Sequence, residues 1–133
     1  MIPEIEKATA EEIKKLQDEK LQDLVAHLAS KSPFYQKLFI TENIDPTKIK
    51  SHEDLAQIPT TSKEDLQQHN DAFFCVPKTE IIDFVTTSGT LGDPVTIGLT
   101  ESDLERLAYN EAISFACAGV KKEDILQLEK VSD

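Results

Sequence analysis

Two of the four glycines in this 133-residue chain lie in one short polar stretch, VTTSGTLGDP, at residues 85–94. Glycine accepts a positive φ and leaves the backbone bare, so successive N–H groups can form a concavity that binds anions. Serine and threonine hydroxyls add donors for phosphate oxygens. The residues that could form this cradle are Thr87, Ser88, Gly89, Thr90 and Gly92. Because these are also ordinary turn residues, the stretch predicts either a polyphosphate-binding loop or a polar hairpin turn. It matches neither the GxxxxGK[ST] nor the GxGxxG nucleotide-binding motif.

The other reactive residue types are scattered along the chain. Cys75 and Cys117 form no CxxC pair and lie in apolar surroundings, which predicts buried, reduced thiols and no metal site. His27, His52 and His69 lie far apart, in contexts that predict surface or structural roles.

The composition limits the possible functions. The length predicts one domain, and the formal net charge is −11. Such acidity excludes the basic surfaces that bind nucleic acid or anionic membranes. The acidic N-terminal region is not a signal peptide, and no stretch approaches the roughly 18 apolar residues of a membrane span. We therefore expect a cytoplasmic protein.

Residues 1–70 read as a series of short helices. Ser or Thr three residues before an acidic residue, or Ser before Pro, typically marks a helix start. The first helix is predicted from Thr9 to about Ser30, because its apolar residues recur at helical spacing. The later starts are Ser32 with Pro33, Ser51 with Asp54, and Ser62 with Asp65; a loop is predicted at residues 41–50, and Pro59 ends the third helix.

Residues 71–133 change in character. The β-branched and aromatic residues at 80–87 predict a strand, and the alternation at 94–99 predicts a second, half-buried strand. The glycine-containing stretch would join them as the loop of a hairpin.

A helix follows this hairpin. Thr100 with Asp103 predicts its start, and Gly119 occupies the position of a left-handed cap after its end. A terminal strand is expected from Ile125. The fold class is therefore α+β: short helices, a hairpin, a helix and a final strand.

Several segments in order resemble the N-terminal part of phenylacetate–coenzyme A ligases. These belong to the adenylate-forming superfamily of acyl- and aryl-CoA synthetases, whose intact large domain is α/β. The segments are SPFYQKLF, SHEDLAQIPTTSKEDL, AFFCVP and residues 86–128. The resemblance runs from about Pro33 to Leu128, and it covers the first third or so of such an enzyme. It implies that residues 1–133 are an N-terminal segment of the large domain.

The resemblance also implies a role for the loop, which in the family closes over the β- and γ-phosphates of ATP. The family pattern is Ser/Thr-Ser-Gly-Thr-Thr-Gly-Lys-Pro, and the candidate residues above match it together with Pro94. Leu91 replaces a threonine and Asp93 replaces the lysine. A carboxylate beside a triphosphate repels it, which leaves three alternatives for Asp93. The side chain points away from the nucleotide, Mg²⁺ lies between the two, or the affinity for the nucleotide is reduced. We expect Asp93 to point away, because it precedes a proline that leads into the second strand. Ala112-Ile113 also departs from a frequent Ala-Arg pair.

The implied reaction uses ATP, Mg²⁺ and coenzyme A. A carboxylate attacks the α-phosphate to give an acyl-adenylate and pyrophosphate, and the coenzyme A thiol then displaces AMP. In the family, the adenine motif, the acid pocket and the catalytic lysine lie further along. We therefore assign no catalytic and no metal-binding residue here. Lys121 and Lys122 are interpreted as partners of a helix C-terminus.

Two hypotheses follow. In the first, the chain is the N-terminal part of an aryl-acid CoA ligase and is not catalytic alone. In the second, it is a complete short remnant that acts as a binding or self-association module. An uncovered sheet would then favour a homodimer paired through strand edges.

Overall fold

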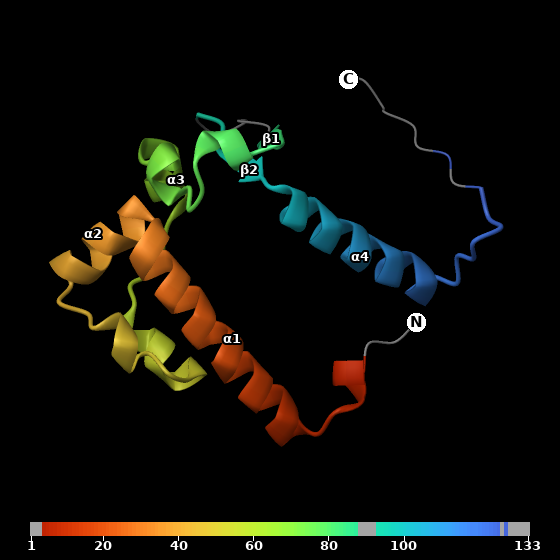
Figure 1. The fold of residues 1–133 in the computed structure, drawn as a ribbon, viewed down its shortest axis with the longest axis horizontal. Coiled ribbons are helices and arrows are strands. Elements are labelled where there is room, and N and C mark those ends of the chain that lie inside the picture. The colour runs from red at the N-terminus through yellow and green to blue at the C-terminus, as the bar shows by residue number, and fades with distance from the viewer. Residues whose placement is uncertain (1–3, 88–92, 126, 128–133) are drawn as a thin grey trace.

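The computed structural model of the chain describes residues 4–87, 93–125 and 127. In these ranges the α-helices are α1 (Ala10–Lys31), α2 (Pro33–Thr41), α3 (Lys63–Gln68) and α4 (Glu101–Cys117); the strands are β1 (Asp83–Thr86) and β2 (Thr96–Leu99). The 3-10 helices are η1 (Glu4–Lys7), η2 (Pro46–Lys48), η3 (His52–Gln57), η4 (Asn70–Phe73) and η5 (Lys78–Glu80). Helices come first, a hairpin follows, and α4 runs out from it, away from α1 (Figure 1). The predicted α+β fold class is confirmed.

The helix starts lie where the sequence predicts them. The Thr9 backbone N–H donates to Glu12 Oε2 at 2.8 Å in a capping box, and this bond lowers the pKa of Glu12. The starts predicted at Ser51 and Ser62 also form capping boxes, although the helix after Ser51 is 3-10 rather than α. Residues 41–50, predicted as a loop, contain the single turn η2.

Ser32 forms the junction between α1 and α2. Its backbone N–H donates to the Leu28 carbonyl at 3.0 Å, and its Oγ accepts from the Tyr35 N–H at 3.4 Å. The same hydroxyl donates to the Ala72 carbonyl at 3.1 Å. Ser32 is completely buried, so one side chain caps the second helix and ties both helices to η4.

The hydrophobic core lies between α1, α2 and the segment that follows them. Its buried members are Leu21, Val25, Phe39 and Ile49. Partly buried Ala29, Tyr35, Ile44 and Ile58 pack around it. Full burial of one such aliphatic or aromatic side chain stabilises a fold by about 1.5–3 kcal/mol. The helical part therefore holds a core of its own.

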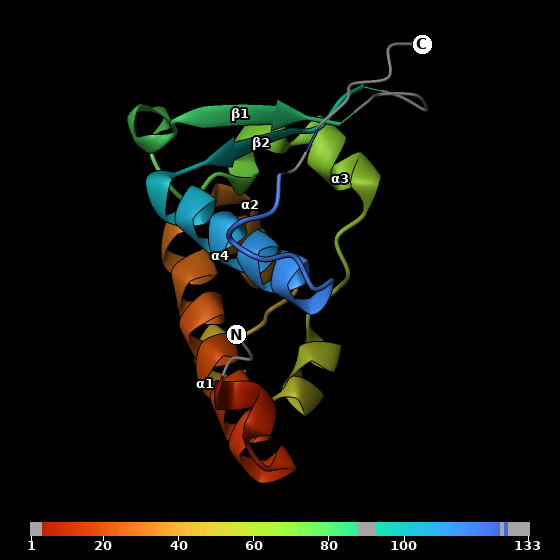
Figure 2. The ribbon, with the colours of Figure 1, turned by 90° about the vertical axis from the view of Figure 1, so that its right-hand side faces the viewer.

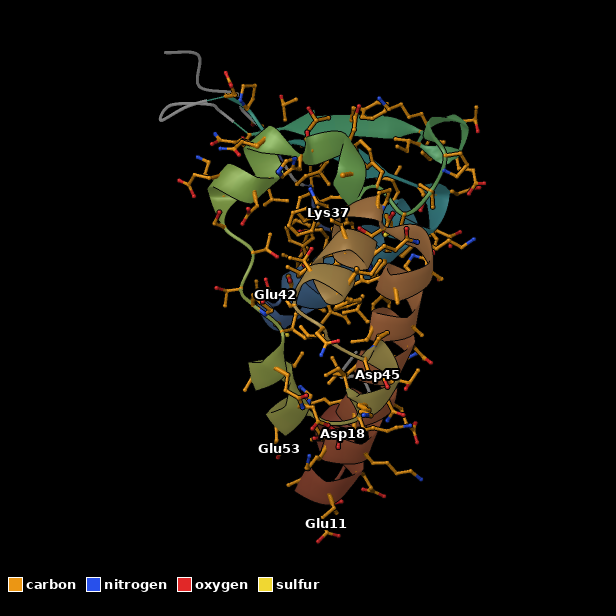
Figure 3. All side chains as sticks on the ribbon, turned by 90° about the vertical axis from the view of Figure 1, so that its left-hand side faces the viewer. Glu11, Asp18, Lys37, Glu42, Asp45 and Glu53 are labelled. Carbon is orange, nitrogen blue, oxygen red and sulfur yellow. The ribbon has the colours of Figure 1, made fainter. Side chains whose placement is uncertain are left out.

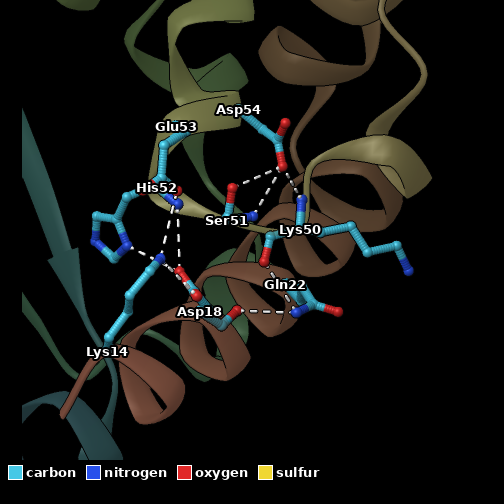
Figure 4. A network of polar contacts seen from close by, with 8 residues as sticks. All are labelled: Lys14, Asp18, Gln22, Lys50, Ser51, His52, Glu53 and Asp54. Atoms are coloured by element: carbon cyan, nitrogen blue, oxygen red, sulfur yellow. Dashed lines mark hydrogen bonds and ion pairs between the residues drawn. The ribbon is translucent and has the colours of Figure 1, made fainter. Parts of the chain in front are cut away.

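A polar network fastens η3 to α1 (Figure 4). Asp18 accepts from Lys14 Nζ at 3.0 Å and from the His52 backbone N–H at 3.3 Å, and its carboxylate lies 3.1 Å from His52 Nδ1. The Lys14 bond, followed by those of His52, lowers the pKa of Asp18. Beside them, Gln22 Nε2 donates to the Lys50 carbonyl at 3.1 Å. His52 thus has a structural role, as the sequence predicts.

β1 and β2 form an antiparallel hairpin whose register runs from Asp83 opposite Leu99 to Thr86 opposite Thr96. In Figure 2 it crosses one end of the molecule above α4. β1 is shorter than predicted, because η5 occupies Lys78–Glu80. The half-burial predicted for the strand at residues 94–99 is correct for Val95, which is buried just before β2, whereas Ile97 is 50% exposed.

The described end of the chain differs from the prediction. Gly119 caps α4 with a φ of +86°, and the N–H groups of Gly119 and Val120 donate to the Ala116 and Phe115 carbonyls, as predicted. Ile125, however, lies in no strand and is 96% exposed, since no described strand runs beside it. Residues 126 and 128–133 of the expected strand lie outside the described residues.

The two cysteines are both free, but only one is shielded. Cys75 is half-buried, and burial raises the pKa of its thiol. Cys117 is exposed, so its predicted burial is wrong; α4 has no buried residue against which to pack it.

Charged side chains, including the labelled Glu11, Lys37, Glu42 and Glu53, surround the helical part (Figure 3). No described helix is long and apolar enough to cross a membrane.

Candidate functional site

The structure places one of the five predicted loop residues, Thr87. Ser88, Gly89, Thr90 and Gly92 lie outside the described residues. The site is therefore seen through the two chain segments that enter and leave the loop.

Thr87 closes the entry to the loop. Its backbone N–H donates to the Val95 carbonyl at 3.0 Å, and its Oγ1 accepts from the Val95 N–H, also at 3.0 Å. This bond uses a lone pair of the hydroxyl oxygen and leaves the O–H proton available for an anion. Since Val95 is buried, the neck of the loop is held against the body of the molecule. Thr87 thus has a structural bond that the sequence did not predict.

The segment that leaves the loop is bound by side chains of α3 and η4. Gln67 Nε2 donates to the Asp93 carbonyl. Asn70 Nδ2 donates to the Thr96 carbonyl at 2.9 Å, and Asn70 Oδ1 accepts from the Thr96 N–H at 2.9 Å. Sequence reasoning missed Gln67 and Asn70, because nothing local marks a contact between residues 26 positions apart.

The residues that depart from the family pattern have few contacts. Asp93 is exposed and forms no ion pair within the described part of the chain, and its expected direction away from the loop stays a prediction. Leu91 lies outside the described residues. Ala112 is exposed on α4, and Ile113 is partly exposed.

Lys121 and Lys122, interpreted from the sequence as partners of a helix C-terminus, are exposed just beyond the end of α4.

A cleft of about 550 Å³ lies behind the hairpin, and the sequence did not predict it. It is mainly apolar, and the residues that line it include Phe73, Phe74, Cys75, Val95 and Gly98. Asn70, Thr100 and Asp103 contribute its polar edge.

The donor set fits phosphate better than a directly bound metal. In the described residues, no three His, Cys, Asp or Glu side chains gather to hold a metal ion. A hydroxyl at the neck of a loop rich in Ser, Thr and Gly can instead donate to phosphate oxygens.

No protein-family model matches the chain. Curated relatives do. The phenylacetate-coenzyme A ligase of Thermus thermophilus is 38% identical over 120 residues, which are 90% of this chain and 27% of the relative. That of Aromatoleum evansii is 34% identical over 93% of this chain and 28% of the relative.

The predicted resemblance to phenylacetate-coenzyme A ligases is confirmed. The chain spans just over a quarter of the length of these ligases. The resemblance includes residues on both sides of the candidate loop, since it covers nine tenths of the chain.

Solved structures of another CoA ligase share the fold. 2-Hydroxyisobutyryl-CoA ligase in the postadenylation state, in complex with 2-HIB-AMP, matches with a TM-score of 0.76 and 26% identity over 84% of this chain and 24% of that chain. The same ligase with 2-HIB-AMP and CoA, in its thioesterification state, matches with a TM-score of 0.70 and 32% identity over 78% and 23%. The described fold is therefore similar to that of about a quarter of this CoA ligase.

Proposed function

We propose that this chain is the N-terminal part of an ATP-dependent, AMP-forming ligase that joins an aryl acid to coenzyme A. In this proposal residues 87–92 hold the phosphates of ATP, and the chain is not catalytic alone. The observation that carries it is the similarity to phenylacetate-coenzyme A ligases along nine tenths of the chain. The hairpin supports it, because the Thr87–Val95 bonds bring both ends of the candidate loop together.

The chemistry assigns the loop a definite task. When a carboxylate attacks the α-phosphate of ATP, negative charge grows on the departing pyrophosphate. Fixed N–H and O–H donors stabilise such charge, since they need no rearrangement during the reaction. Thr87, Ser88 and Thr90 supply hydroxyls, and Gly89 and Gly92 let the backbone come close. Mg²⁺ supplies further neutralisation of the phosphates when bound. Coenzyme A is the acceptor in the second step.

The test is acid-dependent exchange of pyrophosphate into ATP. The protein that carries this chain, at its natural length, is expected to catalyse exchange with phenylacetate or a related aryl acid. 2-Hydroxyisobutyrate serves as the aliphatic comparison, and the 133-residue chain alone is expected to be inactive. If no aryl acid supports exchange by the natural-length protein, the proposal is wrong.

A second candidate is a non-catalytic self-association module. The observation that favours it is the exposure of large apolar side chains on the hairpin and α4, which include Phe84, Ile97, Leu107 and Phe115. In this case the 133-residue chain forms a defined homodimer. Light scattering during size exclusion would show twice the chain mass, and a cooperatively folding monomer would contradict this candidate.

A further inference from the structure

We propose that Asn70 is a positioning residue for the candidate phosphate-binding loop. Its side-chain amide fixes the strand that leaves the loop, and it does so from the edge opposite β1. This inference rests on the proposed function. It adds a residue that lies outside the loop and supports the binding of ATP there.

The side-chain amide of Asn70 takes the place that a neighbouring strand would occupy beside β2. Hydrogen bonds across the hairpin use the carbonyls of Val95 and Leu99. Alternate residues of a strand direct their backbone groups to opposite edges, so those of Thr96 face away from β1. The free edge of β2 thus presents the Thr96 N–H and C=O. The Asn70 amide pairs with both groups, at 2.9 Å each. A side chain with one donor and one acceptor in this geometry matches a backbone edge as a peptide group would.

A second contact acts in the same direction. Gln67 Nε2 donates to the carbonyl of Asp93, the first described residue after the loop. Gln67 and Asn70 therefore hold two points of the segment 93–96, while Thr87 binds it from the inner side through Val95. Both edges of this segment have partners, so its position relative to the loop entry is fixed.

The support for Asn70 is itself anchored in the helical core. Phe73, in the same 3-10 turn, stacks on Phe34 of α2 with ring centroids 4.0 Å apart. The carbonyl of Ala72 accepts from the Ser32 hydroxyl, which is completely buried. A short series of contacts therefore runs from the α1–α2 junction through η4 to the strand at the loop. The helical part acts as a platform that sets where the segment 93–96 lies.

The consequence for the reaction is selective. Loss of the Asn70 amide frees the Thr96 edge and lets the segment 93–96 shift. Under the proposed function this segment adjoins the ATP loop, so we expect the effect on ATP and not on the acid. Misplacement by about 1 Å can reduce a rate on the order of 100-fold, so a partial release is expected to raise the KM for ATP about tenfold.

The experiment compares Asn70→Ala, Asn70→Asp and Gln68→Ala in the natural-length protein. Asp keeps an acceptor for the Thr96 N–H but sets a carboxylate against the Thr96 carbonyl, so it should behave like Ala. Gln68 is the exposed neighbour on α3 and serves as the matched control. We expect both Asn70 variants to raise the KM for ATP about tenfold in pyrophosphate exchange, with the KM for the acid unchanged and Gln68→Ala like the unsubstituted protein.

A second readout does not depend on activity. Amide hydrogen exchange at Thr96 should become at least about tenfold faster in Asn70→Ala, because its N–H loses its acceptor. If Asn70→Ala does not fold, Gln67→Ala tests the same strand through Asp93, with the same selective rise in the KM for ATP expected.

Two outcomes overturn the positioning role alone: an unchanged KM for ATP in the Asn70 variants, or an equal rise in the KM for both substrates. Absence of exchange in the unsubstituted protein overturns the proposed function, and the positioning role falls with it.

Discussion

The helical part, residues 1–70, and the strand part, residues 71–133, differ in what they bury. The helical part encloses a core of four buried hydrophobic side chains, of which Val25 is 2% exposed. In the strand part, Val95 is the one described hydrophobic residue that is buried. The large apolar side chains of its hairpin and α4 are roughly half exposed: Ile82, Phe84, Val85, Ile97, Leu107, Tyr109 and Phe115.

This difference shows that local structure and burial have separate origins. α4 has a capping box like those of α1 and α3, and a glycine cap at its end, and yet none of its residues is fully buried. Short-range hydrogen bonds therefore form the helix, whereas its apolar face needs a partner that the described chain does not supply. Under the proposed function this partner is the remainder of the ligase domain.

The largest effect is expected in the helical core. Phe39→Ala should lower the free energy of unfolding of the chain by about 3–5 kcal/mol, because it leaves a cavity in the only enclosed core of the described residues. Phe115→Ala on α4 is the matched control, and it should change stability by less than about 1 kcal/mol. Urea denaturation followed by circular dichroism measures both. Equal losses would mean that the two parts do not differ as described.

A smaller effect is expected at the junction of the two parts. Ser32→Ala removes a helix cap and leaves the Ala72 carbonyl without its donor, so it should destabilise the chain by about 1–3 kcal/mol. Ser30→Ala, two residues away on the exposed surface, should stay within about 0.5 kcal/mol. Thermal unfolding of the two variants makes the comparison. A Ser32 variant as stable as the Ser30 variant would remove the proposed tie to η4.

Acid should affect the helical part more than the strand part. Backbone N–H groups at the helix starts lower the pKa of Glu12, Asp54, Asp65 and Asp103. A carboxyl whose folded pKa is depressed stabilises the fold above its unfolded pKa, and this stability is lost as the pH falls through the folded value. The loss should therefore begin near pH 4.

Three of these four carboxylates lie in the helical part, so its amide protons should lose more protection than those of α4 between about pH 4 and pH 2. Amide hydrogen exchange at each pH measures this, after correction for the intrinsic rate. Asp103→Asn is the control, since it should remove the pH dependence of α4 alone. Uniform loss across both parts, or none, would contradict this interpretation.

The smallest effect is expected in the reactivity of the two cysteine thiols. Cys117 should react with a disulfide reagent at least about tenfold faster than Cys75, because Cys75 is half-buried and burial raises its pKa. Mass spectrometry of the partly modified chain gives both rates, with the urea-unfolded chain as the reference for equal exposure. Equal rates in the folded chain would contradict the shielding of Cys75.

The sequence predicted what depends on neighbouring residues. The starts at Thr9, Ser32 and Thr100 are correct because an N-cap bonds within three residues. The exposure of Ile97 and Cys117 was missed because burial depends on what packs from elsewhere. The Asn70–Thr96 pair was missed because it joins residues distant in the chain.

The candidate site divides in the same way. Its residue types follow from the sequence, and the structure adds the position of Thr87 and the anchors on either side. The roles of Ser88, Gly89, Thr90 and Gly92 stay predictions. The cytoplasmic location and the binding of ATP and Mg²⁺ also stay predictions.

Under the proposed function, residues 87–92 hold the phosphates of ATP. The most direct measurement is the KM for ATP of the natural-length protein in pyrophosphate exchange, before and after Ser88→Ala with Thr90→Ala. Loss of two hydroxyl donors should raise the KM for ATP or lower the exchange rate by about 100-fold in total, with the KM for the acid unchanged. An unchanged KM for ATP and an unchanged rate would show that this stretch is a hairpin turn and not the phosphate site.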